Sequence, residues 1–208
     1  MAALKNILTR SMQGSEISVQ AQEVLERFRR TGALLEGHFV LTSGLHSESY
    51  LQCALVLQHP QEAEAFGRAL ADQFRTQNIE TVVAPAIGGL IIGYEVARAL
   101  RARFIWTERE ASRMTLRRGF TVRTGETALV VEDVVTTGGS TRETIEALES
   151  AGARIVGAAS IIDRSGGRAD TGVPRVALAT IDVPAVASSE CPACARHEPV
   201  TKPGSRSQ

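Results

Sequence analysis

The chain has 208 residues, which is enough for one α/β domain with a substantial core and a small appendage. Lysine plus arginine and aspartate plus glutamate are equal at 23 each, so no overall electrostatic field attracts nucleic acid or an anionic membrane. No apolar run is long enough to span a bilayer, and the first ten residues lack the apolar core of a signal peptide. Three cysteines are too few for a disulfide framework, so we expect a soluble protein of the reducing cytoplasm.

The N-terminal part predicts one helix and two short strands. A helix over residues 19–28 can be capped by Ser18. Residues 38–41 alternate like a short strand, and residues 42–51 indicate an exposed turn before another strand. We interpret His46 as a solvated histidine of this turn.

The next segment alternates helix and strand. Residues 62–75 predict an amphipathic helix, and residues 81–84 predict a short buried strand. A glycine loop with Gly88 and Gly89 then opens a helix over residues 90–100. Backbone N–H groups at such a helix start attract anions, so we expect an anion site here, with a plain strand-to-helix turn as the alternative.

Residues 103–107 predict a third strand, followed by an arginine-rich stretch at residues 108–123 without sustained periodicity. This stretch is either a solvated hairpin or a mobile arm that closes over a substrate. In the second case Arg109 and Arg113 are the cations that it brings to an anionic leaving group.

The most informative stretch runs from Ala128 to Thr141. Its first four residues suit a strand buried on both faces of a parallel sheet, and Glu132 and Asp133 follow where that strand should end. A helix should begin just behind the loop, where Ser140 and Glu143 have capping-box spacing. The loop itself contains Val134, Val135, Thr136, Thr137, Gly138, Gly139 and Ser140.

This loop has the composition of a phosphate site, because glycines let the backbone approach a ligand and the hydroxyl groups add donors. The two carboxylates instead suit sugar hydroxyls with a hydrated magnesium nearby. No lysine follows the glycines as a P-loop requires, and the G-x-G-x-x-G of a dinucleotide site is absent from this loop.

The last predicted strands cover residues 154–162 and 176–181. Asp163 and Arg164 stand at the end of the first, which is the edge where open α/β sheets bind ligands. An arginine fork matches a carboxylate bidentately, so Arg164 is our candidate reader of a carboxylate. A surface arginine at a strand end is the alternative.

Cys191 and Cys194 form a C-x-x-C pair in the tail. A structural zinc site needs four ligands, for which His197 lies nearby and Cys53 lies far away in the sequence. The pair also lacks the βαβ context of a thioredoxin-like redox motif. We therefore interpret the tail as reduced and structural.

The stretch from Ala128 to Ser140 resembles the signature of the type I phosphoribosyltransferases. The resemblance implies that Glu132 and Asp133 hold the ribose hydroxyls of phosphoribosyl pyrophosphate, and that the loop holds its 5-phosphate. It also implies that Gly88 and Gly89 bind the pyrophosphate half. Magnesium is implied to arrive with the pyrophosphate, held through substrate and water rather than by direct protein ligands.

The N-terminal segment resembles the hood of the orotate phosphoribosyltransferases, whose backbone contacts the base around an aromatic position, here Tyr50 and Leu51. Arg164 and Thr136 are the other implied orotate contacts. Thr42 and Gly88 stand where many members carry lysine, so no lysine contact carries over.

The resemblance implies one α/β domain over residues 1–208, with a mostly parallel central sheet flanked by helices. The hood would lie mainly in residues 1–58, the core in 59–185 and a tail in 186–208. The implied reaction is the conversion of orotate and phosphoribosyl pyrophosphate to orotidine monophosphate and pyrophosphate, with Asp133, Arg109 and Arg113 as catalytic residues. A homodimer is implied, because the family's arm usually acts across a dimer interface.

Two alternatives stay open. A purine phosphoribosyltransferase shares the motif, although it has no use for a bidentate arginine at position 164. A non-catalytic regulator of the same fold would bind RNA or DNA, and the balanced charge argues against it.

Overall fold

The computed structural model describes residues 19–41, 43–182 and 185–202. The chain divides into two compact units. The first combines Met1–Val56 with Ile181–Gln208, and the second is Leu57–Thr180. The C-terminal segment, expected as a separate tail, thus belongs to the same unit as the N-terminal hood.

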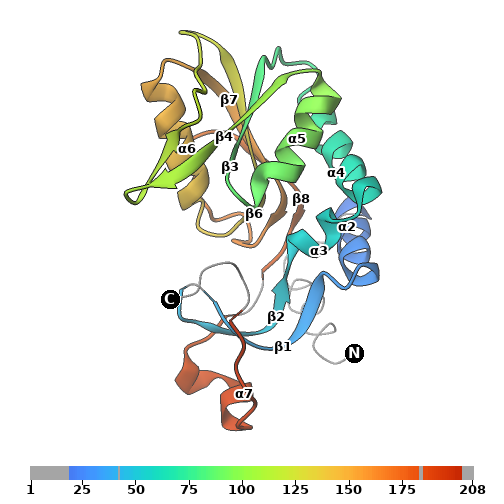
Figure 1. Ribbon diagram of the computed structural model, residues 1–208. Coiled ribbons are helices and arrows are strands. Elements are labelled where there is room, and N and C mark those ends of the chain that lie inside the picture. The colour runs from blue at the N-terminus through green and yellow to red at the C-terminus, as the bar shows by residue number, and fades with distance from the viewer. Residues whose placement is uncertain (1–18, 42, 183–184, 203–208) are drawn as a thin grey trace. The chain divides into compact units, whose positions relative to one another are not determined.

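The second unit is built on a six-stranded sheet with the order β5-β4-β3-β6-β7-β8 (Figure 1). Neighbouring strands are parallel except for the β4–β5 pair, which is antiparallel. The expected mostly parallel sheet is therefore confirmed. The strands are β3 (Thr81–Pro85), β4 (Arg103–Glu110), β5 (Arg113–Leu116), β6 (Thr127–Val135), β7 (Arg154–Asp163) and β8 (Arg175–Thr180).

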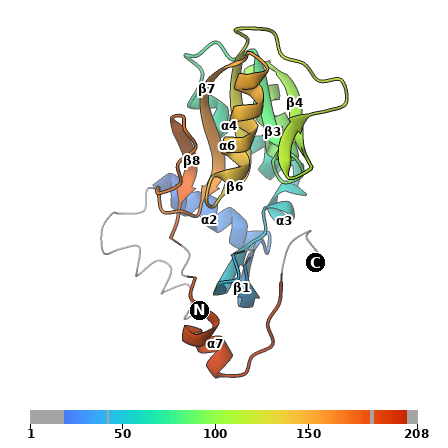
Figure 2. The same cartoon turned by 90° about the vertical axis from the view of Figure 1, so that its left-hand side faces the viewer.

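Helices cover both faces of this sheet, with α4 and α5 on one face and α6 on the other (Figures 1 and 2). Strands covered on both faces should be apolar throughout, and all of β3 and the first five residues of β6 are indeed buried. The α6 side of the core contains Val83, Val130, Ile145 and Leu148. The helices are α4 (Pro60–Asp72), α5 (Gly89–Leu100) and α6 (Gly139–Ser150).

The strand expected to end at Thr107 continues to Glu110 and folds back as β5. Ala111 and Ser112 make the turn with φ of 46° and 74°, the left-handed conformation that favours tight hairpins. The sequence pattern did not predict this hairpin, because its strands carry many charged residues and only Met114 of β5 is buried. The first part of the arginine-rich stretch is therefore an edge hairpin, which was the plainer of the two expectations.

In the first unit, α2 (Val19–Arg30) is followed by an antiparallel hairpin of β1 (Leu34–Val40) and β2 (His46–Leu51). The short helix α3 (Cys53–Leu57) contains the boundary with the second unit. Ser18 and Thr42 lie outside the described residues. The C-terminal segment carries η1 (Ser188–Glu190) and α7 (Pro192–Ala195). Isolated bridges join this segment to both strands of the hairpin, pairing Phe39 with Thr201 and His46 with Val186.

Candidate active site

The two adjacent carboxylates lie on β6 itself, not after it, because β6 stays paired with β7 as far as Val135. The expected strand end before Glu132 was thus wrong. Successive side chains of a strand point to opposite faces, and the contacts follow this rule. Glu132 accepts a hydrogen bond from the Thr141 hydroxyl of α6, whereas the Asp133 carboxylate lies beside Gly88 at the start of α5.

Both carboxylates are poorly hydrated. Burial raises the pKa of Glu132 to about 7; the Thr141 hydroxyl lowers this pKa and the negative charge of Asp133 raises it further. Burial also raises the pKa of Asp133. Two half-buried carboxylates at the carboxyl edge of a sheet are strong hydrogen-bond acceptors whose burial disfavours the charged form. They suit a ligand that brings hydroxyl groups or a hydrated cation.

The glycine loop before α5 packs directly against this pair. A Cβ atom on Gly88 would lie 2.7 Å from Asp133 Oδ1, and a Cβ atom on Gly89 would lie 3.0 Å from the Val131 carbonyl oxygen. The close approach therefore requires glycine at position 88, because any side chain would displace the Asp133 carboxylate. The structure brings the first anion loop and the acidic pair into one site.

Helix α6 begins at Gly139, and Gly138 occupies the N-cap position with φ of 82°. The expected capping box was wrong: Ser140 lies inside the first turn, and Glu143 forms an ion pair with Arg109 at 2.8 Å. The left-handed conformation of Gly138 starts the helix earlier than the side-chain pattern indicated. Gly138 makes no side-chain cap, and the Gly139 N–H donates to the Thr137 hydroxyl at 3.4 Å. The N–H groups of an uncapped helix start can bind an anion.

A pocket of about 350 Å³ opens beside this helix start. Its lining combines hydroxyl groups with two arginines, Arg142 and Arg168. Arg142 is also paired with Asp170 at 3.0 Å. This donor set suits a phosphate group. The lining residues are Thr136, Thr137, Arg142, Ser165, Arg168, Ala169 and Asp170.

Arg164 directly follows β7 at the same edge. Its backbone N–H donates to the Val135 carbonyl at 2.8 Å, which places it beside the start of the Thr136 loop. The preceding Asp163, which the sequence indicated only by its place at the strand end, holds the turn that follows. Its carboxylate accepts from the Ser165 N–H at 2.7 Å and pairs with Arg175 of β8 at 2.6 Å.

Asp163 is almost fully buried. Burial opposes its ionisation, but the hydrogen bonds from Ser165 and Arg175 outweigh this effect and lower the pKa of Asp163. An ionised anchor therefore fixes the turn that carries Arg164. The only sequence signal for this role was an acidic residue at a strand end with Ser165 two positions later, which is typical of an Asx turn.

The remaining predicted residues are dispersed. Arg109 donates to the Ser112 carbonyl at 2.7 Å and pairs with Glu143, so it ties the hairpin turn to α6. Arg113 is exposed on β5. Tyr50 and Leu51 lie on β2 in the first unit, where Leu51 is buried and Tyr50 half-buried.

A model of the phosphoribosyl transferase domain matches residues 54–182. The chain is 52% identical over 184 residues to an orotate phosphoribosyltransferase of Pelotomaculum thermopropionicum, which covers 88% of this chain and 97% of that protein. The solved orotate phosphoribosyltransferase of Aeropyrum pernix is similar with a TM-score of 0.62 and 28% identity, over 76% of this chain and 93% of that one.

The fold is also shared with the Mycobacterium tuberculosis orotate phosphoribosyltransferase in complex with phosphoribosyl diphosphate. That structure has a TM-score of 0.62 and 24% identity, over 77% of this chain and 96% of that one. Within the described part of this chain, no helix has the length and apolar character needed to cross a membrane. With two glycine-rich helix starts, an acidic pair and an arginine at one sheet edge, and with these similarities, the chain belongs to the orotate phosphoribosyltransferase family.

Proposed function

We propose that the protein transfers the phosphoribosyl group of phosphoribosyl pyrophosphate to orotate, giving orotidine 5'-monophosphate and pyrophosphate for pyrimidine nucleotide synthesis. One observation carries the proposal: the start of α6, the Glu132–Asp133 pair and Arg164 stand at the carboxyl ends of two adjacent strands. Phosphate, ribose and a carboxylated base can therefore lie in one line along this edge.

Each part of the edge has a separate task. The start of α6 with Thr136 and Thr137 binds the 5-phosphate, and Glu132 and Asp133 accept hydrogen bonds from the ribose hydroxyls. The glycine loop before α5 presents its backbone to the pyrophosphate. Arg164, held by the Asp163 anchor, pairs with the orotate carboxylate.

The reaction needs no protein nucleophile. The bond from ribose C1 to the pyrophosphate oxygen breaks while a ring nitrogen of orotate bonds to C1. The electron pair leaves with the pyrophosphate, and the proton of the ring nitrogen passes to the pyrophosphate or to water. The ribose gains cationic character, which the neighbouring carboxylates stabilise. Positioning of the two substrates and exclusion of water supply the remaining rate enhancement.

The site chemistry fits magnesium, because Glu132 and Asp133 offer the hard oxygen acceptors that its bound waters need. When bound with the pyrophosphate, magnesium supplies charge neutralisation on the leaving group. The chain's own contribution is to hold the ribose and phosphate ends of the substrate in register with that ion.

The proposal extends to assembly and location. In a homodimer the β4–β5 hairpin and the segment that follows it would bring Arg113 to a partner's pyrophosphate, while Arg109 stays tied to α6 of its own chain. Free cysteines and the absence of a membrane-crossing helix among the described residues support a cytoplasmic enzyme.

The test compares orotate with uracil, adenine and hypoxanthine as acceptors, in the presence of magnesium. We expect turnover of orotate alone. In Arg164→Ala the KM for orotate should rise about 10- to 100-fold, the value of a lost charge-assisted pair, with the KM for phosphoribosyl pyrophosphate nearly unchanged. Arg164→Lys should recover part of the loss.

Arg154→Ala is the matched control, because Arg154 is an exposed arginine at the opposite end of the same strand. It should leave both KM values unchanged. Turnover of a purine would contradict the base assignment, and binding of phosphoribosyl pyrophosphate without turnover of any base would favour a regulator.

A further inference from the structure

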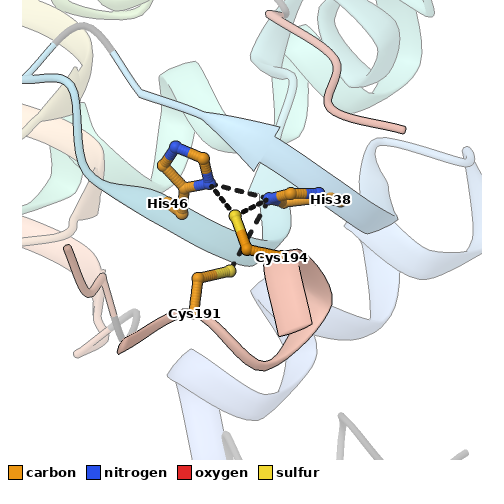
Figure 3. Close-up of side chains that lie close together, drawn as sticks. All are labelled: His38, His46, Cys191 and Cys194. Carbon is orange, nitrogen blue, oxygen red and sulfur yellow. Dashed lines mark hydrogen bonds between the residues drawn. The ribbon is translucent and has the colours of Figure 1, made fainter. Parts of the chain in front are cut away.

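Four metal-binding side chains meet in the first unit, outside the candidate active site. His38 lies on β1, His46 on β2, Cys191 just before α7 and Cys194 within it (Figure 3). One nitrogen or sulfur atom from each residue lies within 4.8 Å of all the others. The expectation of a solvated turn histidine at position 46 was therefore wrong.

Three of the separations between these atoms match those in a tetrahedral metal site. His38 Nε2 lies 3.6 Å from Cys191 Sγ and 3.5 Å from Cys194 Sγ, and His46 Nδ1 lies 3.4 Å from Cys194 Sγ. A tetrahedral zinc ion with its usual bonds to nitrogen and sulfur places its ligand atoms about 3.3–3.8 Å apart. The two histidine nitrogens, at 2.7 Å, need to separate by only about 0.6 Å to reach this range.

The protonation of His38 also suits a ligand. Its Nδ1 lies 2.8 Å from the backbone carbonyl oxygen of Glu198. A carbonyl can only accept, so Nδ1 donates to it, which leaves Nε2 as the ring nitrogen that faces the other three ligand atoms. A hydrogen bond from the outer nitrogen to a carbonyl is the usual way in which proteins orient a metal-binding histidine.

Two of the four side chains are buried, with Cys191 3% and His38 6% exposed, and His46 and Cys194 are half-buried. Four protein ligands leave no open position for a substrate, so a metal here would be structural. Two thiolates with two imidazoles favour zinc over magnesium or calcium, which prefer oxygen.

We propose that His38, His46, Cys191 and Cys194 bind one zinc ion, which fastens the C-terminal segment to the β1–β2 hairpin. The backbone already joins the two at either side of the cluster, from Val40 N–H to the Thr201 carbonyl at 2.9 Å and from His46 N–H to the Val186 carbonyl at 2.8 Å. The unit is small, and a structural metal can supplement the core of a small unit.

The test uses full-length protein purified under reducing conditions without a polyhistidine tag. Metal content is measured by mass spectrometry, and cobalt(II) is substituted to report geometry. We expect zinc in a one-to-one ratio, and a cobalt spectrum with tetrahedral and thiolate-to-metal bands. Cys194→Ser and His46→Ala should both lose the zinc.

Two matched controls remove the same residue types outside the cluster: Cys53→Ser and His197→Asn. Asparagine tolerates the left-handed φ of 55° at position 197. Both controls should keep their zinc. Should the ligand variants fail to fold, the cobalt spectrum of the unmodified protein decides the question alone.

The zinc site would be overturned by a metal-free protein that takes up no added zinc, or by full zinc content in Cys194→Ser. A Cys191–Cys194 disulfide in protein isolated without reductant and without zinc would assign the pair to redox chemistry instead. None of these measurements depends on phosphoribosyl transfer, so the two proposals can fail separately.

Discussion

At the scale of single residues, Glu132 and Asp133 are neighbours in the sequence with different surroundings. Strand geometry sends Glu132 toward Thr141 of α6 and Asp133 toward Gly88 of α5. Both pay a desolvation penalty that raises their pKa. Such a desolvation penalty is typical of sites that bind a ligand at a cost in stability.

This penalty predicts a pH-dependent stability change in Glu132→Gln. The pKa of Glu132 in the folded protein, about 7, lies above its ordinary value of 4.5, so protonation stabilises the fold below pH 4.5 and this contribution is lost as the pH rises through 7. Glutamine keeps an acceptor for Thr141 without the buried charge. Without substrate, the variant should be about 1–3 kcal/mol more stable at pH 8 and equal at pH 4.5.

Urea denaturation at the two pH values measures this difference, and kcat/KM for phosphoribosyl pyrophosphate should fall in the same variant. Glu149→Gln on the exposed face of α6 is the control and should change neither property. A stability gain of the same size at both pH values would contradict the explanation.

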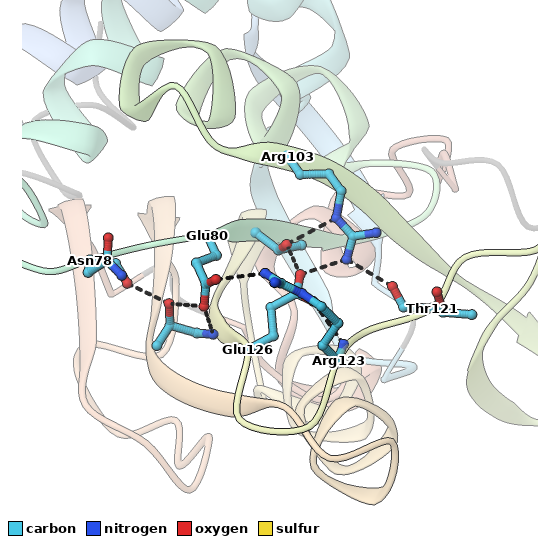
Figure 4. Close-up of polar contacts among 8 residues, drawn as sticks. Asn78, Glu80, Arg103, Thr121, Arg123 and Glu126 are labelled. Carbon is cyan, nitrogen blue, oxygen red and sulfur yellow. Dashed lines mark hydrogen bonds and ion pairs between the residues drawn. The ribbon is translucent and has the colours of Figure 1, made fainter.

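At the scale of elements, the sheet has a polar cluster at each end of its strands. One cluster suits a ligand, and the other stabilises the fold. The edge opposite the active site holds a network of ion pairs, in which Glu126 and Glu80 contact Arg103 and Arg123 (Figure 4). Glu126 is 3% exposed and accepts from Arg103 at 2.7 Å. Here every carboxylate has its donors, so the network stabilises the strand starts.

The network predicts acid sensitivity. Burial alone would raise the pKa of Glu126, but the Arg123 backbone N–H, the Thr81 hydroxyl and Arg103 lower it to about 2. Its stabilisation is therefore present above pH 4.5 and is lost as the pH falls toward 2. Glu126→Gln should lower the free energy of unfolding by about 2–3 kcal/mol at pH 7, with a smaller difference at pH 3.

Denaturation at both pH values checks this expectation, again with Glu149→Gln as the exposed control. An equal loss at pH 7 and pH 3 would mean that shape, and not charge, accounts for the effect of Glu126.

At the scale of the whole molecule, the arginine-rich stretch at residues 108–123 can contribute to the active site of its own chain or to that of a partner. Arg109 is paired with Glu143 of its own chain, whereas Arg113 is exposed. We expect Arg113→Ala and Arg164→Ala to complement each other when co-expressed with different tags. A heterodimer then has one site with both changes and one intact site.

Random assembly makes half of the dimers heterodimers, so about a quarter of wild-type activity should return when orotate is kept well below the raised KM of Arg164→Ala. Each variant expressed alone is the control. If the arm acts within its own chain, every site carries one change and the mixture shows no recovery.

The sequence predicted the parts of the fold that depend on local pattern. The apolar run of β6, the glycine loops and the periodicity of α4 indicated alternating strands and helices, and the structure has them. Residue spacing also indicated one shared edge for Glu132, Asp133 and Arg164, because parallel strands end together. The start of α6 was misplaced, because the conformation of Gly138 outweighs the Ser140–Glu143 pattern.

Tertiary structure alone decided the contacts between distant segments. Cys191 and Cys194 were visible as a pair, but their partners His38 and His46 lie about 150 residues away, and no local pattern relates them. The same holds for Glu80, Arg103 and Glu126. Local periodicity fixes which elements form and which face is apolar, whereas the pairing of far-separated side chains depends on how those elements pack.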